Sequence, residues 1–191
     1  MRHIAATALL SMGSLLVAGC NDPARVTDPR APLLAAPVSD VSSGSPSHPI
    51  ELLDQCDPAT FNGAVGPGTC TSSHPGITFD RFLAQLTNDQ AAPAWRNAPV
   101  NFTTKLGTTL VAINRGGEVH SFTRVAAFGG GVVPFLNQLS GTPVPAPECL
   151  EAPLSEYLLP GGQDAEPADQ RGTLYYQCCI HPWMRTTVSV H

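Results

Sequence analysis

Cys178-Cys179-Ile180-His181-Pro182-Trp183-Met184, close to the C-terminus of the 191-residue chain, places a thiolate, an imidazole and a thioether on one tight turn. Two histidines and a cysteine in a trigonal arrangement, with a weak and long bond to an axial methionine, are the ligands of blue-copper electron-transfer sites. One more histidine from a distant strand would complete this set. A Cys-x-x-His-x-x-Met string alone can arise by chance, so the second histidine decides the interpretation.

His120 is the candidate for the missing ligand. It follows a stretch of strand-forming residues at 105–115 and a short loop at 116–119. A lone histidine after a strand is more often a surface or core residue than a ligand. The two stretches have the order, strand context and spacing of a known family of metal proteins, and this resemblance favours a metal site.

Residues 105–123 and 178–184 together resemble the cupredoxin family, in its small plastocyanin and azurin branch, and the C-x-x-H-P-x-M spacing resembles that of amicyanin. The resemblance covers residues 99–191. It implies an all-β fold, a Greek-key antiparallel β-sandwich, with one type 1 copper ion as cofactor. The implied metal ligands are His120, Cys178, His181 and Met184. The implied function is to carry single electrons between redox protein partners.

Two adjacent cysteines compete for the role of thiolate ligand. Residues 172–178 have the aromatic and β-favouring character of a strand, so Cys178 and Cys179 are expected to point to opposite faces. Cys178 leaves two residues before His181, enough for a turn that brings both side chains onto one ion, whereas Cys179 leaves only Ile180. The resemblance also favours Cys178. A binuclear copper centre needs two bridging cysteines farther apart in the sequence, so we expect one copper ion.

One position departs from the family pattern. Relatives commonly have Asn directly after the first histidine, where it braces the metal loop, and this chain has Ser121. A serine hydroxyl has a single proton to donate. The rigidity of the site and its reduction potential therefore depend on how Ser121 is used.

The N-terminal residues predict export and lipid attachment. Arg2 and His3 precede an apolar stretch at 4–16, and small residues lead to Cys20, as in a secretory signal that ends in a lipobox. The apolar stretch is shorter than the roughly 20 residues of a membrane span. We expect a lipoprotein signal peptide at 1–19 and lipidation of Cys20, which anchors the protein to a membrane of the cell envelope, facing the periplasm or the cell exterior. Asn21 favours the outer membrane if the organism has two.

The rest of the chain divides into three expected parts. Residues 20–50 contain many prolines without apolar periodicity and predict a disordered tether, with a reach of about 30 Å. Residues 51–98 are expected to form an N-terminal extension, and residues 99–191 the cupredoxin-like copper-binding domain. Within the latter, the Gly- and Pro-rich stretch 128–170 is expected to form a long flap beside the metal.

The cysteines that bind neither lipid nor metal are Cys56, Cys70, Cys149 and Cys179. Their number is even, and the predicted compartment is oxidising, so disulfides are expected. Four cysteines allow three pairings. Closure of the Gly- and Pro-rich loop between Cys56 and Cys70 would add about 3 kcal/mol of stability, and Cys149 and Cys179 would then form the second pair.

Composition excludes one class of function and limits the fold. The formal net charge is −5, and no basic face is expected that could neutralise the phosphates of a nucleic acid. Seventeen glycines and nineteen prolines favour turns over helices. The one helical stripe is Phe79, Phe82, Leu83 and Leu86, although a strand beginning near Gly76 is an alternative. Strands are expected at 100–105, 109–113, 119–125, 172–178 and 186–190.

Apolar side chains near His181 predict a surface for electron exchange. Pro182 and Trp183 of the metal loop and Phe135 of the flap are expected to form an electron-port patch around the solvent edge of His181, which is where electrons leave in the family. The alternative is that Trp183 and Phe135 only pack against each other.

Three functions compete. The first is a membrane-tethered electron carrier, the second a copper-holding or copper-delivery lipoprotein, and the third a metal-free interaction domain in which Cys178 is oxidised. An enzyme is not expected, because four protein ligands leave no open position on the metal. Methionine-rich tracts would favour delivery, but Met184 is the one methionine after the signal peptide.

Overall fold

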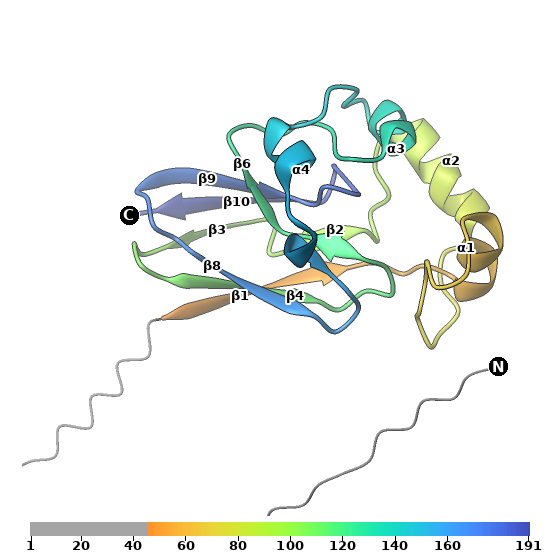
Figure 1. Ribbon diagram of the computed structural model, residues 1–191, viewed down its shortest axis with the longest axis horizontal. Coiled ribbons are helices and arrows are strands. Elements are labelled where there is room, and N and C mark those ends of the chain that lie inside the picture. Colours follow the sequence, from red (N-terminus) through yellow and green to blue (C-terminus); the bar gives the residue numbers. More distant parts are fainter. Residues whose placement is uncertain (1–45) are drawn as a thin grey trace, which may run out of the picture. The chain divides into compact units, whose positions relative to one another are not determined.

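The computed structural model describes residues 46–191 (Figure 1). The predicted signal peptide, Cys20 and most of the predicted tether lie outside the described residues. Between residues 46 and 191, no helix has the length and apolarity to cross a membrane.

The strands of this region form two four-stranded sheets and one two-stranded sheet (Figure 1). The first sheet has the order β2 (Arg96–Ala98), β1 (Ser47–Leu53), β4 (Thr109–Asn114), β8 (Gln163–Pro167). The second has the order β3 (Asn101–Thr104), β10 (Arg185–Val190), β9 (Gly172–Gln177), β6 (Thr123–Val125). The two-stranded sheet pairs β5 (His120–Ser121) with β7 (Tyr157–Leu158).

The expected all-β sandwich is confirmed, but its sheets are mixed and not purely antiparallel. β1 runs parallel to β4, and β3 runs parallel to β10, whereas the other pairs are antiparallel. A parallel pair needs a crossover connection of roughly a dozen residues or more. Residues 54–108 provide it between β1 and β4, and they include β2 at the edge of the first sheet and β3 of the second.

The two large sheets share one hydrophobic core. Alternate residues are buried in β4, where Leu110 and Ala112 are 0 % exposed, and in β10, where Val188 is 0 % exposed. These side chains belong to the same cluster as Tyr176 of β9 and Ile50 of β1. Burial of each large apolar side chain contributes roughly 1.5–3 kcal/mol, so the core holds both sheets in register around the segments that join them.

The helices are α1 (Pro58–Ala64), α2 (Phe79–Asp89), α3 (Pro134–Leu139) and α4 (Pro147–Glu151), with a 3-10 turn at Leu154–Glu156. Figure 1 shows α1, α2 and α3 together at the end of the sandwich opposite the C-terminus. The helical interpretation of residues 79–86 is confirmed by α2. Its first turn is capped by Thr78, whose side chain accepts a hydrogen bond from the Arg81 N–H, and Gln90 ends it in the left-handed conformation.

The structure differs from the expected division of the chain. β1 begins at Ser47, inside the predicted tether, and residues 51–98 contribute the end of β1 and all of β2 to the first sheet. The predicted flap ends in β8, which pairs with β4. The alternation in β1 buries only Ile50 and Leu52 and is interrupted by Pro49, so its strand signal in the sequence is short.

Two disulfides join the cysteines in the expected pairs. Cys56 is bonded to Cys70, and Cys149 is bonded to Cys179. The first closes the loop that contains α1, and the second ties α4 to the residue that follows Cys178. Cys178 is the one free cysteine among residues 46–191.

Candidate metal site

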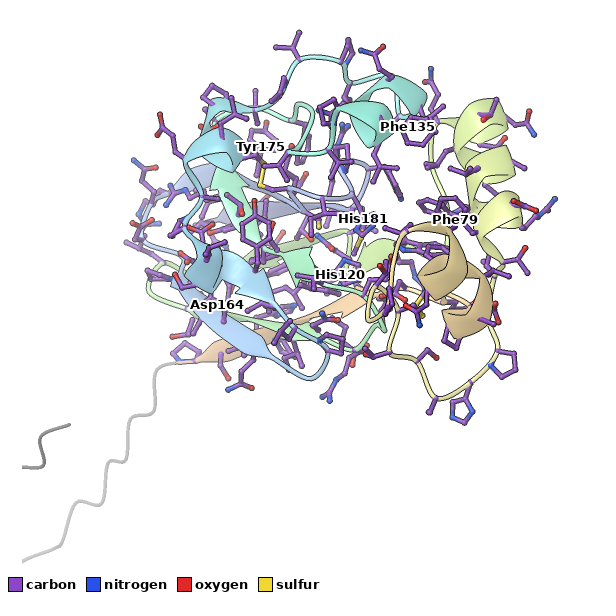
Figure 2. All side chains as sticks on the ribbon, turned by 45° about the vertical axis from the view of Figure 1, so that its right-hand side comes forward. Phe79, His120, Phe135, Asp164, Tyr175 and His181 are labelled. Atoms are coloured by element: carbon purple, nitrogen blue, oxygen red, sulfur yellow. A yellow bond between two sulfur atoms is a disulfide. The ribbon has the colours of Figure 1, made fainter. Side chains whose placement is uncertain are left out.

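Three side chains from distant parts of the sequence meet in the interior. His120 lies at the start of β5, and Cys178 and His181 lie in the loop between β9 and β10. The Cys178 Sγ is 3.8 Å from the Nδ1 atoms of both histidines, and the two Nδ1 atoms are 3.3 Å apart. All three residues are buried. In Figure 2, His120 and His181 lie next to each other near the centre of the molecule.

The size of this triangle fits a metal ion. With bonds of about 2.05 Å to nitrogen and 2.3 Å to sulfur, a trigonal ion separates nitrogen from sulfur by about 3.8 Å and the two nitrogens by about 3.6 Å. The observed separations are close to these values. A thiolate with two imidazoles is a donor set suited to copper.

Met184 completes the loop that carries Cys178 and His181 of the triangle. Its side chain is fully buried in the same hydrophobic cluster as Cys178. The loop is closed by backbone hydrogen bonds, because the Met184 N–H donates to the His181 carbonyl (2.9 Å) and the Cys178 N–H donates to the Met184 carbonyl (3.0 Å). The flanking strands are paired up to Gln177 and Arg185. The loop is therefore short, closed and held at both ends.

The environment of Cys178 favours its thiolate form. Burial alone would raise the pKa of the thiol, but hydrogen bonds and the charges of His120 and His181 lower it well below its usual value. The backbone N–H of Ser121 also points at the Cys178 Sγ, at 3.4 Å. A metal-binding cysteine must lose its proton, so this environment is suited to binding.

Ser121 braces the metal loop as an acceptor. Its Oγ accepts a hydrogen bond from the Cys179 N–H (2.8 Å) and another from the Thr123 hydroxyl (3.1 Å). The expectation from the sequence concerned only the single proton that the serine hydroxyl can donate. Serine thus makes a side-chain contact with the metal loop at the position where the family commonly has Asn.

A buried carboxylate contacts the outer nitrogen of His120. The Nε2 atom of His120 is 2.8 Å from the Oδ2 atom of Asp54, and both side chains are 0 % exposed. Burial alone would raise the pKa of Asp54, but the hydrogen bond with His120 and two backbone N–H groups lower it to about 2. Burial would lower the pKa of His120, and the hydrogen bonds with Asp54 and Cys178 raise it to about 9.

A second carboxylate faces the outer nitrogen of His181. The Oε2 atom of Glu118 is 3.7 Å from the His181 Nε2 and accepts a hydrogen bond from the indole N–H of Trp95. Burial raises the pKa of Glu118, although the nearby His181 and the Trp95 hydrogen bond oppose the rise. Each histidine of the triangle thus has a carboxylate beside the nitrogen that points away from Cys178.

The sequence did not predict Asp54, Glu118 or Trp95 as parts of the site. Glu118 lies two residues before His120, so its nearness to the site was available from the sequence. Asp54 and Trp95 carry no such signal, because they reach the site through the packing of residues 51–98, which were expected to form a separate extension.

The side of the site nearest the predicted electron-port patch is covered. His181 is only 3 % exposed, and Pro182 is buried. Trp183 is half-buried and packs edge-on against the His181 ring, with 5.4 Å between ring centroids. Phe135 is 56 % exposed. The electron-port function of these residues stays a prediction.

An apolar pocket leads from the surface to His181. Its volume is about 260 Å³, and it is lined by residues of α1, α2, α3 and the metal loop, among them Phe61, Phe82, Phe135 and Ile180, with Glu118 and His181 also on its wall. In Figure 2, Phe135 and Phe79 lie on the helical side of His181. Access to the imidazole therefore passes between the helices.

The comparisons with known proteins give a weak structural likeness. No family model matches the chain, and no curated protein matches its sequence. Among solved structures, it is similar to a purple cupredoxin from Nitrosopumilus maritimus, with 16 % identity and a TM-score of 0.41 over 75 % of this chain and 98 % of that one.

Two amicyanin variants solved as copper(I) forms are also similar. They show 20 % and 22 % identity, with TM-scores of 0.35 and 0.33, over 50 % and 48 % of this chain and 73 % and 70 % of theirs. Because these identities and TM-scores are low, the function of this chain has to be inferred from the geometry of its own residues.

Replacement of Ser121 by Ala tests the brace. The Cys179 N–H would lose its partner in a buried place, which costs about 1–3 kcal/mol, so we expect a lower free energy of unfolding and weaker metal binding. Chemical denaturation and metal titration measure the two effects. Ser189→Ala, at an exposed position of β10, is the control, and equal behaviour of the two variants would show that the brace is unimportant.

Proposed function

We propose that this chain is a type 1 copper protein of the cupredoxin kind that carries single electrons between redox partners. The observation that carries the proposal is the buried triangle of His120, Cys178 and His181, with separations of 3.3–3.8 Å and Met184 buried in the same loop. Copper bound there would supply the one-electron couple. The chain holds the donor atoms still, which reduces the rearrangement that accompanies each electron.

The burial of the site supports a carrier over a delivery protein. The apolar pocket reaches the His181 imidazole, whereas His120, Cys178 and Met184 are 0 % exposed, so a competing acceptor would have little direct access to three of the four proposed ligands. A delivery protein needs an accessible ligand to begin the exchange of its metal. No catalytic role is proposed, because the four ligands leave no open coordination position.

Disulfide pairing argues against the metal-free alternative. Cys179, the neighbour of Cys178 in the sequence, is bonded to Cys149. Cys178 is therefore left without a cysteine partner within residues 46–191. A buried thiol between two imidazoles has a clear use as a metal ligand. An interaction domain would not need it.

Copper loading tests the proposal directly. The protein should bind one copper ion per chain and show an intense thiolate-to-copper absorption band in the visible spectrum, which Cys178→Ser should abolish. His120→Ala and His181→Ala should each weaken copper binding greatly. Met184→Leu should retain copper and raise the reduction potential, because the axial bond is long and contributes least.

Comparison of the cysteine, histidine and methionine variants separates this site from other copper sites. Cys179→Ser breaks a disulfide but should leave the visible band in place. Loss of the band in Cys179→Ser with its retention in Cys178→Ser would contradict the ligand assignment. Equal loss of copper from the histidine and methionine variants would indicate a different coordination.

We propose that electrons leave through the apolar pocket beside His181, with Pro182, Trp183 and Phe135 as the electron-port patch. Phe135 is the cleaner probe, because it is exposed, whereas Trp183 packs against His181. Phe135→Asp adds a charge to a contact that a partner must desolvate. It should slow electron exchange while leaving the copper spectrum intact. Leu159→Asp, at a residue that is 68 % exposed and does not line the pocket, is the control; equal rates for both variants would refute the port.

We further propose that the protein is lipid-anchored through Cys20 and works in the cell envelope, facing the periplasm or exterior. The support is the apolar stretch at 4–16 and the small residues before Cys20. Cys20→Ser should block lipidation and leave the protein unattached or unprocessed, as judged by membrane fractionation. Mature protein that stays with the membrane after this change and a salt wash would reveal another anchor.

A further inference from the structure

Asp54 is a buried carboxylate beside the proposed metal site, and it is not one of the four proposed ligands. Its carboxylate accepts three hydrogen bonds. The His120 Nε2 (2.8 Å) and the Glu118 N–H (3.0 Å) donate to Oδ2, and the Cys56 N–H (3.1 Å) donates to Oδ1. The side chain is 0 % exposed. A carboxylate withdrawn from water needs such a set of donors, and one of these donors belongs to a proposed metal ligand.

The loop before β5 is shaped to receive this carboxylate. A methyl group on Gly116 would lie 1.9 Å from the Asp54 Oδ2, and one on Gly117 would lie 2.8 Å from the Cys56 Sγ. Glycine at both positions therefore permits the close approach of the two segments. The disulfide from Cys56 to Cys70 and the hydrogen bond from the Thr71 N–H to the Gly117 carbonyl hold them together.

The contact determines which nitrogen of His120 faces the metal. When Nε2 carries the proton that it donates to Asp54, Nδ1 keeps its lone pair, and it is Nδ1 that faces Cys178 and His181. A carboxylate behind a metal-binding histidine fixes the orientation of its ring and makes it a stronger donor. The carboxylate of Asp54 also accepts hydrogen bonds from two backbone N–H groups, and a carboxylate that accepts several such bonds is held in its charged form.

The negative charge of Asp54 is expected to shift the balance between copper(II) and copper(I). A buried anion close to the metal stabilises copper(II) more than copper(I), since the oxidised ion carries the greater charge, and a dry surrounding strengthens this preference. Glu118 faces the other histidine, His181, at 3.7 Å. It therefore does not replace the contact of Asp54 with His120.

We propose that Asp54 is a positioning residue of the copper site, which holds the His120 ring with Nδ1 toward the metal and, through its charge, favours copper(II) over copper(I). This inference rests on the proposed function, because it assumes that the triangle binds copper. It assigns part of the metal site to the segment that follows β1, about 120 residues before the metal loop in the sequence.

The test compares Asp54→Asn with Asp57→Asn in the copper-loaded protein. Both remove one carboxylate, but Asp57 is half-buried and caps α1 away from the triangle, and Asn also caps helices well. In Asp54→Asn, we expect the copper(II) affinity to fall about 10-fold or more and the copper(I) affinity to fall less. The reduction potential should then rise by about 59 mV for each factor of ten by which the ratio of the two affinities falls. Asp57→Asn should change neither quantity.

A measurement without redox chemistry tests the positioning. Titration with cobalt(II) should show about 10–100-fold weaker binding for Asp54→Asn than for the unchanged protein. An unchanged potential in a folded, copper-loaded Asp54→Asn protein, or equal weakening of both copper oxidation states, would overturn the effect of the charge. Unchanged cobalt(II) affinity would overturn the positioning role.

Further outcomes separate this inference from the proposed function. If Asp54→Asn does not fold, Asp54→Ser, which is smaller and also uncharged, is measured in the same way. Failure of both to fold, while Asp57→Asn folds, would show that the residue is structural and overturn the proposal. If the unchanged protein shows no thiolate-to-copper band, the proposed function fails and the inference with it, whereas a normal band with an unshifted potential in the Asp54 variants defeats the inference alone.

Discussion

The structure depends on keeping two imidazoles and a thiol together in a dry interior without leaving their polar atoms unpaired. Burial of unpaired polar groups costs several kcal/mol, so each atom of the triangle needs a partner. The inner nitrogens of His120 and His181 face each other and Cys178, and the outer nitrogens face Asp54 and Glu118. The sheets fix the positions from which these side chains extend, because β9 and β10 remain paired up to both ends of the metal loop.

The segment between β1 and β3 supplies aromatic side chains that pack beside the metal loop, residues 178–184. Its aromatic side chains form a connected cluster that includes Phe82 and Trp95, with 4.6 Å between ring centroids, and Trp183 joins it through Phe82. Trp183 contacts both Phe82 of α2 and the His181 ring, so the imidazole, which was expected to have a solvent edge, is covered. The pocket beside His181 is lined mainly by apolar side chains, and a lower local dielectric strengthens the effect of the two carboxylates on the site.

Local patterns predicted the parts of the site that lie close together in the sequence. The spacing of Cys178, His181 and Met184 gave the metal loop, and the 3–4 residue repeat from Phe79 to Leu86 gave α2. Contacts that form only in the folded chain were beyond such patterns. Asp54 follows a strand with a short and interrupted alternation, so nothing in its neighbourhood indicates that it meets His120, 66 residues later. The parallel pairing of β1 with β4 was missed for the same reason, because alternation identifies a strand but not its neighbour.

The positions of the disulfides suggest where the fold needs rigidity. One follows Asp54 by two residues, at Cys56, and the other begins at Cys179, directly after the proposed thiolate ligand. Each therefore restrains a segment that carries a residue of the site. A metal site works only if its ligands are held within a fraction of an ångström by the residues around them, and short loops alone rarely provide such restraint. Ser121 adds a third restraint between β5 and the metal loop. The rigid frame thus includes residues on both sides of the proposed metal position, and the segment before β3 is as much a part of it as the loop that carries Cys178 and His181.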